Sequence, residues 1–362
     1  MPRVLHVIDH NGLGGAQRLV SDILRYRPQD QFFPLRLKQP SLFIPNPNSS
    51  NALSRSQLNF FYALRQLYGY LQSGKFQILH CHLQASWLAG LLLRNTCAKK
   101  GIPTLFHEHN PYIAHTSLYK NLVRSAAKRG RMIAVSPYIQ NELITVGVPE
   151  NNIFLLPNFV DPTKFKPCQS KSSDLVQKNP SKIILGFAGR LNPQKGWQFA
   201  FQALKQLTSR PVELWVAGEG ADEIKARHWV AQQELEEQIK FLGMVKDMPA
   251  FYQAIDVLIH PVVEEPFGLV PIEAQACQVP VVAFAFRGSE YLFQPGSAML
   301  CPLGDSVALA NAVENILDDP QVRQSLIQRG TQNAQRFSST AFFQRLEKIY
   351  QQVLSEIESE TA

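Results

Sequence analysis

The chain has 362 residues, of which 45% are hydrophobic and 18% charged, so it is not an intrinsically disordered polymer. A single core stops growing at about 250 to 300 residues, so the length predicts two domains that meet at a cleft. The net charge of +7 is divided unevenly, with +11 on residues 1–160 and −4 on the rest. Such asymmetry indicates that one half meets a polyanion, a membrane surface or an anionic substrate, although a merely basic soluble surface is an open alternative.

The first half opens with an apolar run at residues 4–8, which predicts a strand. A glycine-bearing loop at 12–15 and a helical pattern follow it. Further apolar strands, each followed by a helical pattern or a turn, are predicted at 77–80, 103–107 and 132–135. Strands that alternate with helices favour a parallel sheet buried on both faces. The segment 39–57 is rich in Pro, Asn and Ser, which predicts an exposed loop.

A polar stretch at 166–181 is the candidate linker, and the alternation resumes after it. Strands are then predicted at 183–188, 213–217, 239–242, 257–260 and 280–284. Two such runs predict an α/β fold of two Rossmann-like domains with parallel sheets that face a central cleft. We place the domains at 1–160 and 161–340, followed by an amphipathic terminal helix within 341–362.

The segment 264–274 joins a predicted strand to a predicted helix, at the sheet edge where ligands of open parallel sheets bind. The backbone N–H groups of Phe267, Gly268 and Leu269 would lie at the helix N-terminus and favour a phosphate. Glu265 and Glu273 can face the same cleft and accept hydrogen bonds from sugar hydroxyls. In the structural alternative, Glu265 caps the helix and Glu273 is solvated.

A second loop carries two cations after the predicted strand 183–188. Arg190 and Lys195 are five residues apart, with Gly189 and Gly196 beside them. Arginine can bind a diphosphate through two nitrogens and lysine adds a point charge, so together they could stabilise a leaving nucleotide without a metal. Without Lys195 nearby, Arg190 would be interpreted as a surface residue that forms a salt bridge.

The sequence indicates a metal-independent site, because it contains no Asp-x-Asp motif. His80 and His82 share a strand face, as do His107 and His109, but zinc needs three or four ligands and the sequence specifies no third. We therefore predict no metal, and a single active histidine in the cleft. We choose His107, because it lies nearer the end of its strand.

The loop with Gly14 and Gly15 lacks the third glycine of the dinucleotide fingerprint. It is better interpreted as a loop whose backbone a sugar phosphate can approach. The five cysteines are widely spaced and indicate a reducing compartment. No apolar run approaches the ~20 residues of a membrane-spanning helix, so we predict a cytoplasmic protein that could be peripheral on the inner membrane face.

Cations follow one another at residues 119–132, which we interpret as a basic helix. They are Lys120, Arg124, Lys128, Arg129 and Arg131. Such a helix could lie on anionic lipid, and a solvated helix face is the alternative. We expect no nucleic acid partner.

Several motifs together resemble the nucleotide-sugar half of the retaining glycosyltransferases of family four. They are Gly189-Arg190, Lys195-Gly196, Gly218-Glu219-Gly220, Glu265-Pro266-Phe267-Gly268, Glu273-Ala274 and Pro280-Val281-Val282-Ala283. The resemblance implies the GT-B architecture, with a terminal helix that crosses back to the N-terminal domain. It also implies that Arg190 and Lys195 bind the donor diphosphate.

The same resemblance implies further site residues. Glu273 corresponds to the ribose-binding carboxylate, Glu265 to the carboxylate at the transferred sugar, and His107 to the histidine near the reacting centre. The backbone at Gly14 and Gly15 would approach the phosphates. The main chain of the segment Gly243, Met244 and Val245 would hold the base.

The resemblance implies a retaining transferase that moves a hexose from a UDP- or GDP-sugar to a hydroxyl of a lipid-linked or saccharide acceptor. The product would be a cell-surface polysaccharide or glycolipid, and the enzyme would need no cofactor or metal. His107, Glu265, Arg190 and Lys195 would be the catalytic residues. The alternatives are a nucleotide-sugar 2-epimerase and a non-catalytic sugar-nucleotide-binding protein. One departure from the family is Gln278, which stands at a helix end where glycine is frequent.

Overall fold

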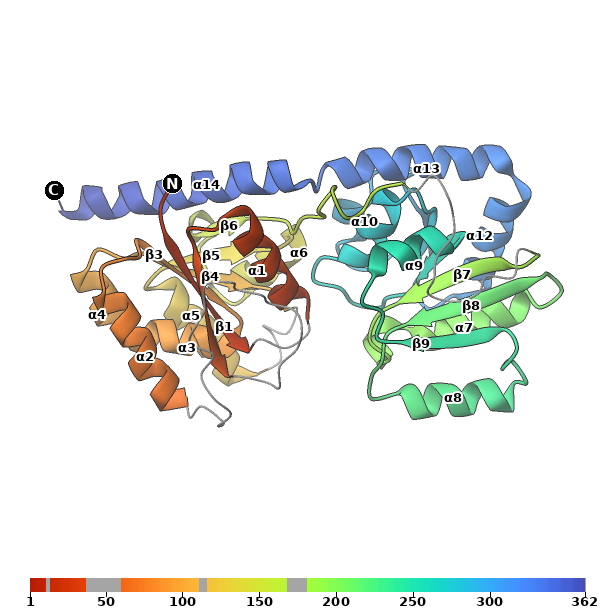
Figure 1. The fold of residues 1–362 in the computed structure, drawn as a ribbon, viewed down its shortest axis with the longest axis horizontal. Coiled ribbons are helices and arrows are strands. Elements are labelled where there is room, and N and C mark those ends of the chain that lie inside the picture. Colours follow the sequence, from red (N-terminus) through yellow and green to blue (C-terminus); the bar gives the residue numbers. More distant parts are fainter. Residues whose placement is uncertain (11–13, 37–59, 111–115, 168–180, 362) are drawn as a thin grey trace. The chain divides into compact units, whose positions relative to one another are not determined.

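The computed structural model describes residues 1–10, 14–36, 60–110, 116–167 and 181–361 (Figure 1). The chain forms two units, one made of Met1–Asn158 with Phe342–Ala362 and the other of Phe159–Ala341. The chain therefore passes from the first unit to the second at Asn158, upstream of the stretch 166–181. The prediction that this stretch links the domains is wrong, and residues 168–180 of it lie outside the described part, as does the loop predicted at 39–57.

The first unit is built on a six-stranded sheet with the order β2-β1-β3-β4-β5-β6, in which every pair is parallel. Its strands are β1 (Val4–His10), β2 (Gln31–Arg36), β3 (Ile78–His82), β4 (Thr104–Glu108), β5 (Arg131–Ala134) and β6 (Ile153–Leu155). Its helices are α1 (Gly15–Tyr26), α2 (Phe60–Gln72), α3 (Gln84–Leu92), α4 (Arg94–Lys99), α5 (Ser117–Ala127), α6 (Pro137–Thr145), the 3₁₀ helix Glu150–Asn152 and most of α14 (Ser339–Thr361).

The second unit repeats this design with the order β12-β11-β10-β7-β8-β9, again all parallel. Its strands are β7 (Ile183–Ala188), β8 (Val212–Ala217), β9 (Ile239–Gly243), β10 (Val257–His260), β11 (Val281–Phe284) and β12 (Met299–Cys301). Its helices are α7 (Trp197–Gln206), α8 (Glu223–Gln232), α9 (Met248–Ala254), α10 (Leu269–Ala276), α11 (Ser289–Leu292), α12 (Ser306–Asp318), α13 (Pro320–Gln335) and the 3₁₀ helix Pro193–Lys195.

The nine predicted strands are confirmed, and so is the α/β fold with two Rossmann-like sheets. Three strands were missed, namely β2, β6 and β12. Pro34 interrupts the apolar pattern of β2, and the strand tolerates it because β2 lies at the sheet edge. The other two strands have three residues each, too few to give a periodic signal.

The strand orders fix where ligands can bind. In the first sheet the order reverses direction between β1 and β3, and in the second between β7 and β10. Open parallel sheets bind ligands beside the carboxyl ends of the strands at such a switch point. Each unit therefore has one favoured edge.

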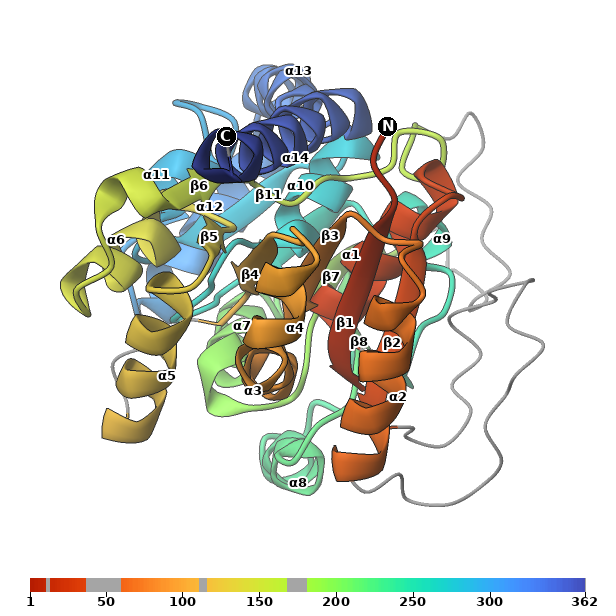
Figure 2. The same ribbon diagram turned by 90° about the vertical axis from the view of Figure 1, so that its left-hand side faces the viewer.

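Helix α14 binds the first unit through charged and aromatic contacts, and Figures 1 and 2 show it beside the amino end of β1. Glu347 accepts a hydrogen bond of 2.6 Å from the buried guanidinium of Arg27. Glu356 accepts one of 2.9 Å from Nε of Arg131. These ion pairs fix the rotation of α14 about its own axis. Within the described residues, no helix combines the length and apolar character needed to cross a bilayer.

The basic helix predicted at 119–132 is confirmed only as far as Ala127. Helix α5 ends at Ala127, and Arg131 opens β5. Arg131 is occupied by Glu356, and Arg124 donates a hydrogen bond of 2.8 Å to the backbone oxygen of Val146. The exposed cations that remain near the end of α5 are Lys128 and Arg129, with Lys120 half-buried.

Gln278 adopts the left-handed conformation, with φ of 62°, directly after α10. The left-handed conformation destabilises the folded state by roughly 1–2 kcal/mol when the residue has a Cβ atom. Replacement by glycine removes this strain, but glycine also raises the conformational entropy of the unfolded chain, which offsets part of the gain. Gln278→Gly is therefore expected to raise the free energy of unfolding by about 0.5–1 kcal/mol. Urea unfolding checks this, with Gln278→Ala as the control that keeps Cβ; equal stability of the two variants would contradict it.

Candidate functional site

The loops that follow β7, β8 and β9 pack against one another at the carboxyl edge of the second sheet. Leu191 N–H donates to the backbone oxygen of Glu219 at 3.1 Å, and Gly218 N–H donates to that of Gly243 at 2.8 Å. A Cβ atom at Gly218 would lie 2.0 Å from the backbone oxygen of Gly189. The glycines of these loops thus permit a close-packed edge.

The loops after β7 and β10 meet at the switch point. Gly196 has φ of +67°, and a Cβ atom there would lie 1.9 Å from the backbone oxygen of Pro261. This close approach sets Lys195 beside Glu265, and their side chains form an ion pair with 20% and 14% of their surface exposed. The two residues, predicted for separate roles, therefore form one charged pair that an incoming ligand can reach.

Arg190 lies in the same loop as Lys195, two residues beyond the end of β7. Its side chain is exposed, and among the residues that the structure describes no carboxylate forms an ion pair with it. A diphosphate at this edge would find one unpaired guanidinium and one ammonium. It would have to compete with the carboxylate of Glu265 for the ammonium of Lys195.

The two predicted carboxylates lie in different environments, Glu265 in the loop before α10 and Glu273 within the helix. The N-cap of α10 is Gly268, with φ of 100°, and the carboxylate of Glu265 pairs with Lys195. Glu273 is only 2% exposed, and Oε2 accepts a hydrogen bond of 2.9 Å from the hydroxyl of Tyr252. The structural alternative for these two residues is therefore wrong. Leu269 is the first residue of α10, Gly268 is its N-cap and Phe267 precedes the cap; a phosphate at their N–H groups stays a prediction.

The predicted base-binding segment follows β9. Met244 is half exposed, and its backbone N–H already donates to Oε1 of Glu219 at 3.1 Å. A base at Gly243–Val245 would have to use other main-chain groups or displace this carboxylate. The sequence interpretation missed Glu219 as the partner of this backbone.

The first unit gathers five histidines on one side of its sheet, at the switch point. They are His6 on β1, His80 and His82 on β3, His107 on β4 and His109 just after it. Their exposed fractions are 0%, and 9% for His109. The parallel register places His6 opposite His80, and His82 opposite His107.

This cluster overturns two steps of the sequence reasoning. His107 is no nearer its strand end than His82, because the two are register partners. The argument that no third imidazole is available is also wrong, since His82, His107 and His109 each offer a nitrogen within 4.8 Å of the others, as do His6, His80 and His82. Three imidazoles with an open position are a ligand set that zinc uses, so the geometry permits a metal that the sequence argument excluded.

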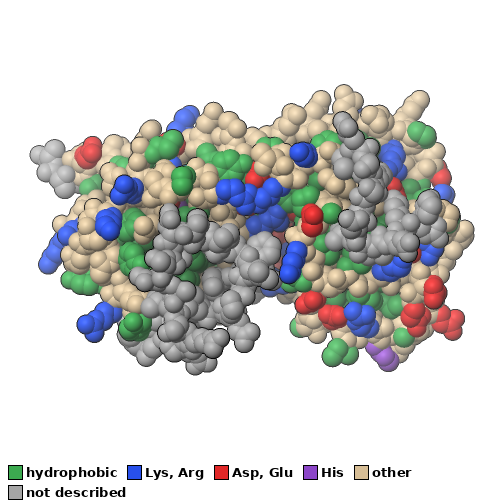
Figure 3. Space-filling model, in the orientation of Figure 1, with side chains coloured by type: hydrophobic (Ala, Val, Ile, Leu, Met, Phe, Trp, Pro, Cys, Tyr) green, Lys and Arg blue, Asp and Glu red, His purple; other side chains and the backbone are tan. Residues whose placement is uncertain are grey.

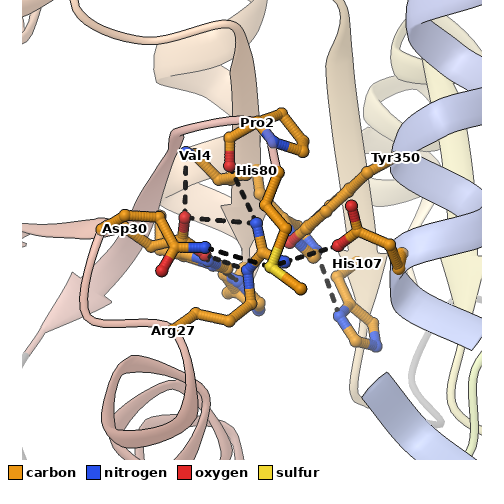
Figure 4. A network of polar contacts seen from close by, with 12 residues as sticks. Pro2, Val4, Arg27, Asp30, His80, His107 and Tyr350 are labelled. Carbon is orange, nitrogen blue, oxygen red and sulfur yellow. Dashed lines mark hydrogen bonds and ion pairs between the residues drawn. The ribbon is translucent and has the colours of Figure 1, made fainter. Parts of the chain in front are cut away.

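The imidazoles are joined by hydrogen bonds in two chains, and Figure 4 shows His80, His107 and Tyr350 of the first. The first runs from the Tyr350 hydroxyl to Nδ1 of His80 at 2.9 Å, and from Nε2 of His80 to Nδ1 of His107 at 3.3 Å. Nε2 of His107 is buried and has no hydrogen-bond partner among the residues that the structure describes. Tyr350 comes from α14, 270 residues away from His80 in the sequence.

The second chain begins at a carboxylate. Oδ2 of Asp30 lies 3.4 Å from Nε2 of His6, and Nδ1 of His6 lies 3.1 Å from Nε2 of His82. Nδ1 of His82 lies 3.1 Å from Nε2 of His109. Arg27 also binds Asp30, at 2.6 Å. The sequence interpretation missed Asp30, Arg27 and Tyr350 entirely.

Burial determines the protonation of these groups. It lowers the pKa of His80, His82 and His107 well below the usual value of histidine, and that of His109 to about 3. These four imidazoles are therefore neutral at pH 7. Burial alone would raise the pKa of Asp30, but hydrogen bonds from His6 and Arg27 lower it, so the carboxylate stays ionised.

Glu108 lies between His107 and His109 in the sequence, and its side chain is fully buried. It accepts hydrogen bonds from the hydroxyl of Tyr119 and from the backbone N–H groups of His109 and Asn110. Burial nevertheless dominates and raises the pKa of Glu108 to about 7. This carboxyl group therefore titrates near neutrality.

Gly14 and Gly15 stand at the N-terminus of α1, and both are exposed. A Cβ atom at Gly14 would lie 2.3 Å from Oε1 of Gln17, whereas Gly15 has open space around it. The backbone here is exposed, and the approach of a sugar phosphate to it stays a prediction. Residues 11–13, which include Gly12 and Leu13 of the same loop, lie outside the described part.

Two family models match successive parts of the chain. The model described as "Glycosyltransferase Family 4" matches residues 15–164, and that described as "Glycosyl transferases group 1" matches residues 170–333.

Curated relatives are similar over part of their length. A D-inositol 3-phosphate glycosyltransferase of Pseudarthrobacter chlorophenolicus is 29% identical over 69% of this chain and 64% of its own length. The capsular polysaccharide biosynthesis glycosyltransferase CapM of Staphylococcus aureus is 26% identical over 63% of each chain. The chain thus spans just under two thirds of these two relatives.

Solved structures match nearly the whole chain. Anabaena HepE in complex with UDP and glucose superposes with a TM-score of 0.80 at 21% identity, covering 96% of this chain and 99% of HepE. A sucrose-phosphate synthase from Thermosynechococcus elongatus gives a TM-score of 0.75 at 20% identity. The match covers 98% of this chain and 100% of the synthase. At these identities the similarity concerns the fold, which is GT-B.

The raised pKa of Glu108 should make the stability of the protein depend on pH. This pKa is raised from 4.5 to about 7 in the folded state, so the contribution of Glu108 to stability is greatest below pH 4.5 and falls as pH rises towards 7. Glu108→Gln should therefore become more stable relative to wild type between pH 4.5 and 7, with ~3 kcal/mol as the upper limit. Urea unfolding at pH 5, 6, 7 and 8 measures the difference. A difference that does not change with pH would contradict the raised pKa.

Proposed function

Because the chain belongs to glycosyltransferase family 4 and has the GT-B fold, we propose that it is a retaining hexosyltransferase. It moves a hexose from a nucleoside diphosphate sugar to an acceptor hydroxyl. The observation that carries this proposal is the charged edge between β7 and β10. There Arg190 is exposed and Lys195 pairs with Glu265 beside the N-terminus of α10.

The proposed donor site matches the charge of a diphosphate. Arg190, Lys195 and the first N–H groups of α10 would stabilise the negative charge that grows on the leaving group. Because these groups supply positive charge without a metal, we propose that transfer is metal-independent. Glu273 is held in place by Tyr252 and would bind the ribose hydroxyls, while Glu265 would contact the sugar.

The proposed reaction needs no nucleophile from the enzyme. The bond between the anomeric carbon and the diphosphate oxygen breaks, and the acceptor oxygen forms its bond to that carbon on the same face. The proton of the acceptor hydroxyl passes to the leaving phosphate oxygen. His107 would hydrogen-bond to the sugar near the reacting carbon, and the backbone at Gly14 and Gly15 would approach the phosphates.

The acceptor is proposed from the charge of the first unit. In Figure 3 the charged side chains on its visible face are mainly Lys and Arg, whereas Asp and Glu gather near α8 of the second unit. The positive first unit suits a phosphorylated or lipid-linked acceptor on an anionic surface. A lipid-linked or saccharide acceptor in polysaccharide or glycolipid synthesis also agrees with the names of CapM and the inositol phosphate enzyme.

We also propose that the first unit lies on a membrane surface through α5 and α3, which pack together. Three leucines of these two helices expose large fractions of their surface: Leu118 at the start of α5 82%, and Leu92 and Leu88 on α3 50% and 43%. Apolar side chains flanked by cations are typical of interfacial binding. The protein would then act from the cytoplasm, peripheral to the inner face of the membrane.

The membrane proposal predicts salt-sensitive binding to vesicles that contain phosphatidylglycerol. Each cation near the surface is worth about 1 kcal/mol, so replacing both Lys128 and Arg129 by Ala should weaken binding about thirtyfold. Vesicle co-sedimentation measures this, with Lys225→Ala on α8 as the control. Equal binding of the double variant and the wild type would refute the proposal that this surface binds the membrane.

Donor chemistry predicts the effect of Lys195→Ala. Loss of one group that stabilises the leaving diphosphate should lower kcat by about 10²–10³-fold. The measurement is nucleotide release and glycoside formation with a panel of UDP- and GDP-sugars and candidate acceptors. Lys205→Ala is the matched control, because Lys205 is exposed on α7 and donates only to Gln233.

Wild-type turnover in Lys195→Ala would refute the donor site. Activity that EDTA abolishes and Mg²⁺ or Mn²⁺ restores would refute metal independence. Formation of an epimer from UDP-N-acetylglucosamine without acceptor would favour the 2-epimerase. NMR of the new glycosidic linkage tests retention.

A further inference from the structure

We propose that Tyr350 of α14, acting through His80, holds His107 in the tautomer with the proton on Nε2. His107 then meets its substrate as a hydrogen-bond donor. The proposal deepens the function proposed above and rests on it for the identity of the substrate. Tyr350 and His80 are positioning residues, because they act through His107.

The direction of the first chain follows from the Tyr350 hydroxyl. Tyr350 is fully buried, and within the described residues its hydroxyl has His80 as its hydrogen-bond partner. If Nδ1 of His80 carried the proton, the phenolic hydrogen would be buried without an acceptor. Tyr350 therefore donates to Nδ1 of His80.

The remaining protons are then determined. A neutral imidazole carries one N–H group and one lone pair, so His80 has its proton on Nε2 and donates it to Nδ1 of His107, 3.3 Å away. His107 must keep its own proton on Nε2. That nitrogen is the buried atom without a partner, so the chain ends in an unused donor.

The second chain has the opposite polarity because it begins at an acceptor. When His6 is neutral, the carboxylate of Asp30 accepts from Nε2 of His6, and Nδ1 of His6 accepts from Nε2 of His82. Nδ1 of His82 accepts from Nε2 of His109. His109 thus keeps a lone pair on Nδ1. Its ring centroid lies 4.1 Å from that of His107, which puts the ends of the two chains, a donor and an acceptor, next to each other.

This pairing defines a role for His107. A donor at Nε2 can bind a sugar or phosphate oxygen but cannot take the proton of the acceptor hydroxyl. It is therefore suited to hold the sugar rather than to act as the general base. A hydroxyl group could accept from His107 while it donates to His109.

Helix α14 controls the donor end of this arrangement (Figure 4). The guanidinium of Arg27 lies over the ring of Tyr350, 5.1 Å from its centroid. Arg27 also bonds Glu347 on the same helix and Asp30 at the start of the second chain. One buried cation thus orients the first group of each chain.

The test is the tautomer of His107 in protein labelled with ¹⁵N-histidine, read from two-bond ¹H–¹⁵N correlations without substrate. The His107 signal is assigned by its loss in His107→Gln. The wild type should show a protonated Nε2 and an unprotonated Nδ1. In Tyr350→Phe, His80 is free to reverse, and the Nδ1–H form of His107 should become measurable. Tyr70→Phe is the control, because its ring lies in the same unit and is 41% exposed.

Activity gives a second measurement. If His107 donates to the sugar in the transition state, Tyr350→Phe should lower kcat about five- to tenfold and leave KM for the donor within twofold. The tautomer does not depend on turnover, so a wild type with the expected tautomer but no transfer would refute the proposed function alone.

Three results would overturn the inference. They are Nδ1–H on His107 in the wild type, an unchanged tautomer in folded Tyr350→Phe, and stoichiometric metal in the purified protein, since ligated nitrogens would not form these chains. The wild-type spectrum decides the question even if Tyr350→Phe fails to fold.

Discussion

Every strand in both sheets runs parallel to its neighbours, so within each unit all strands end at the same edge. Parallel pairing leaves the side chains and loops that follow several strands close together, although they are far apart in the sequence. In the second unit this edge collects the loops of Arg190, Glu219 and Glu265. In the first unit it collects imidazoles from three strands. Both candidate regions are consequences of this one geometric constraint.

The two edges use polar groups in opposite ways. The second unit keeps its charges partly exposed, so a diphosphate can reach them with little desolvation cost to the protein. The first unit buries neutral imidazoles, and an unpaired buried polar group costs about 1–3 kcal/mol. The two hydrogen-bonded chains reduce this cost for most of the nitrogens. The exposed edge is suited to bind charge, and the buried one to hold a fixed pattern of donors and acceptors.

Most of the fold could be predicted from the sequence because nine strands are continuous apolar runs. The charged edge of the second unit could be predicted as well, since Arg190, Lys195 and Glu265 stand in loops directly after or near such strands. The histidine cluster could not. The His-x-His spacing shows that two side chains share a strand face, but only the strand order reveals that β3 lies between β1 and β4.

Other residues were missed because of long-range contacts. Tyr350 occurs in an amphipathic helix where every aromatic residue fits the apolar face, and nothing in its neighbourhood distinguishes a tyrosine with a buried hydrogen-bond partner. Glu108 is a charged residue in a segment that the structure buries completely. Its partner Tyr119 follows only eleven positions later, but their contact depends on how α5 packs against the sheet.

The first unit is discontinuous, since Phe342–Ala362 belongs with Met1–Asn158. During synthesis on the ribosome, the second unit therefore emerges while the first still lacks α14. Until then His80 has no phenolic donor, and Arg27 lacks both Glu347 and the ring of Tyr350. The histidine face can hydrate and exchange its tautomers freely at that stage. The order of translation makes the tyrosine the final part of the cluster, so a chain truncated before α14 would have an incomplete hydrogen-bond pattern even where its sheet had formed.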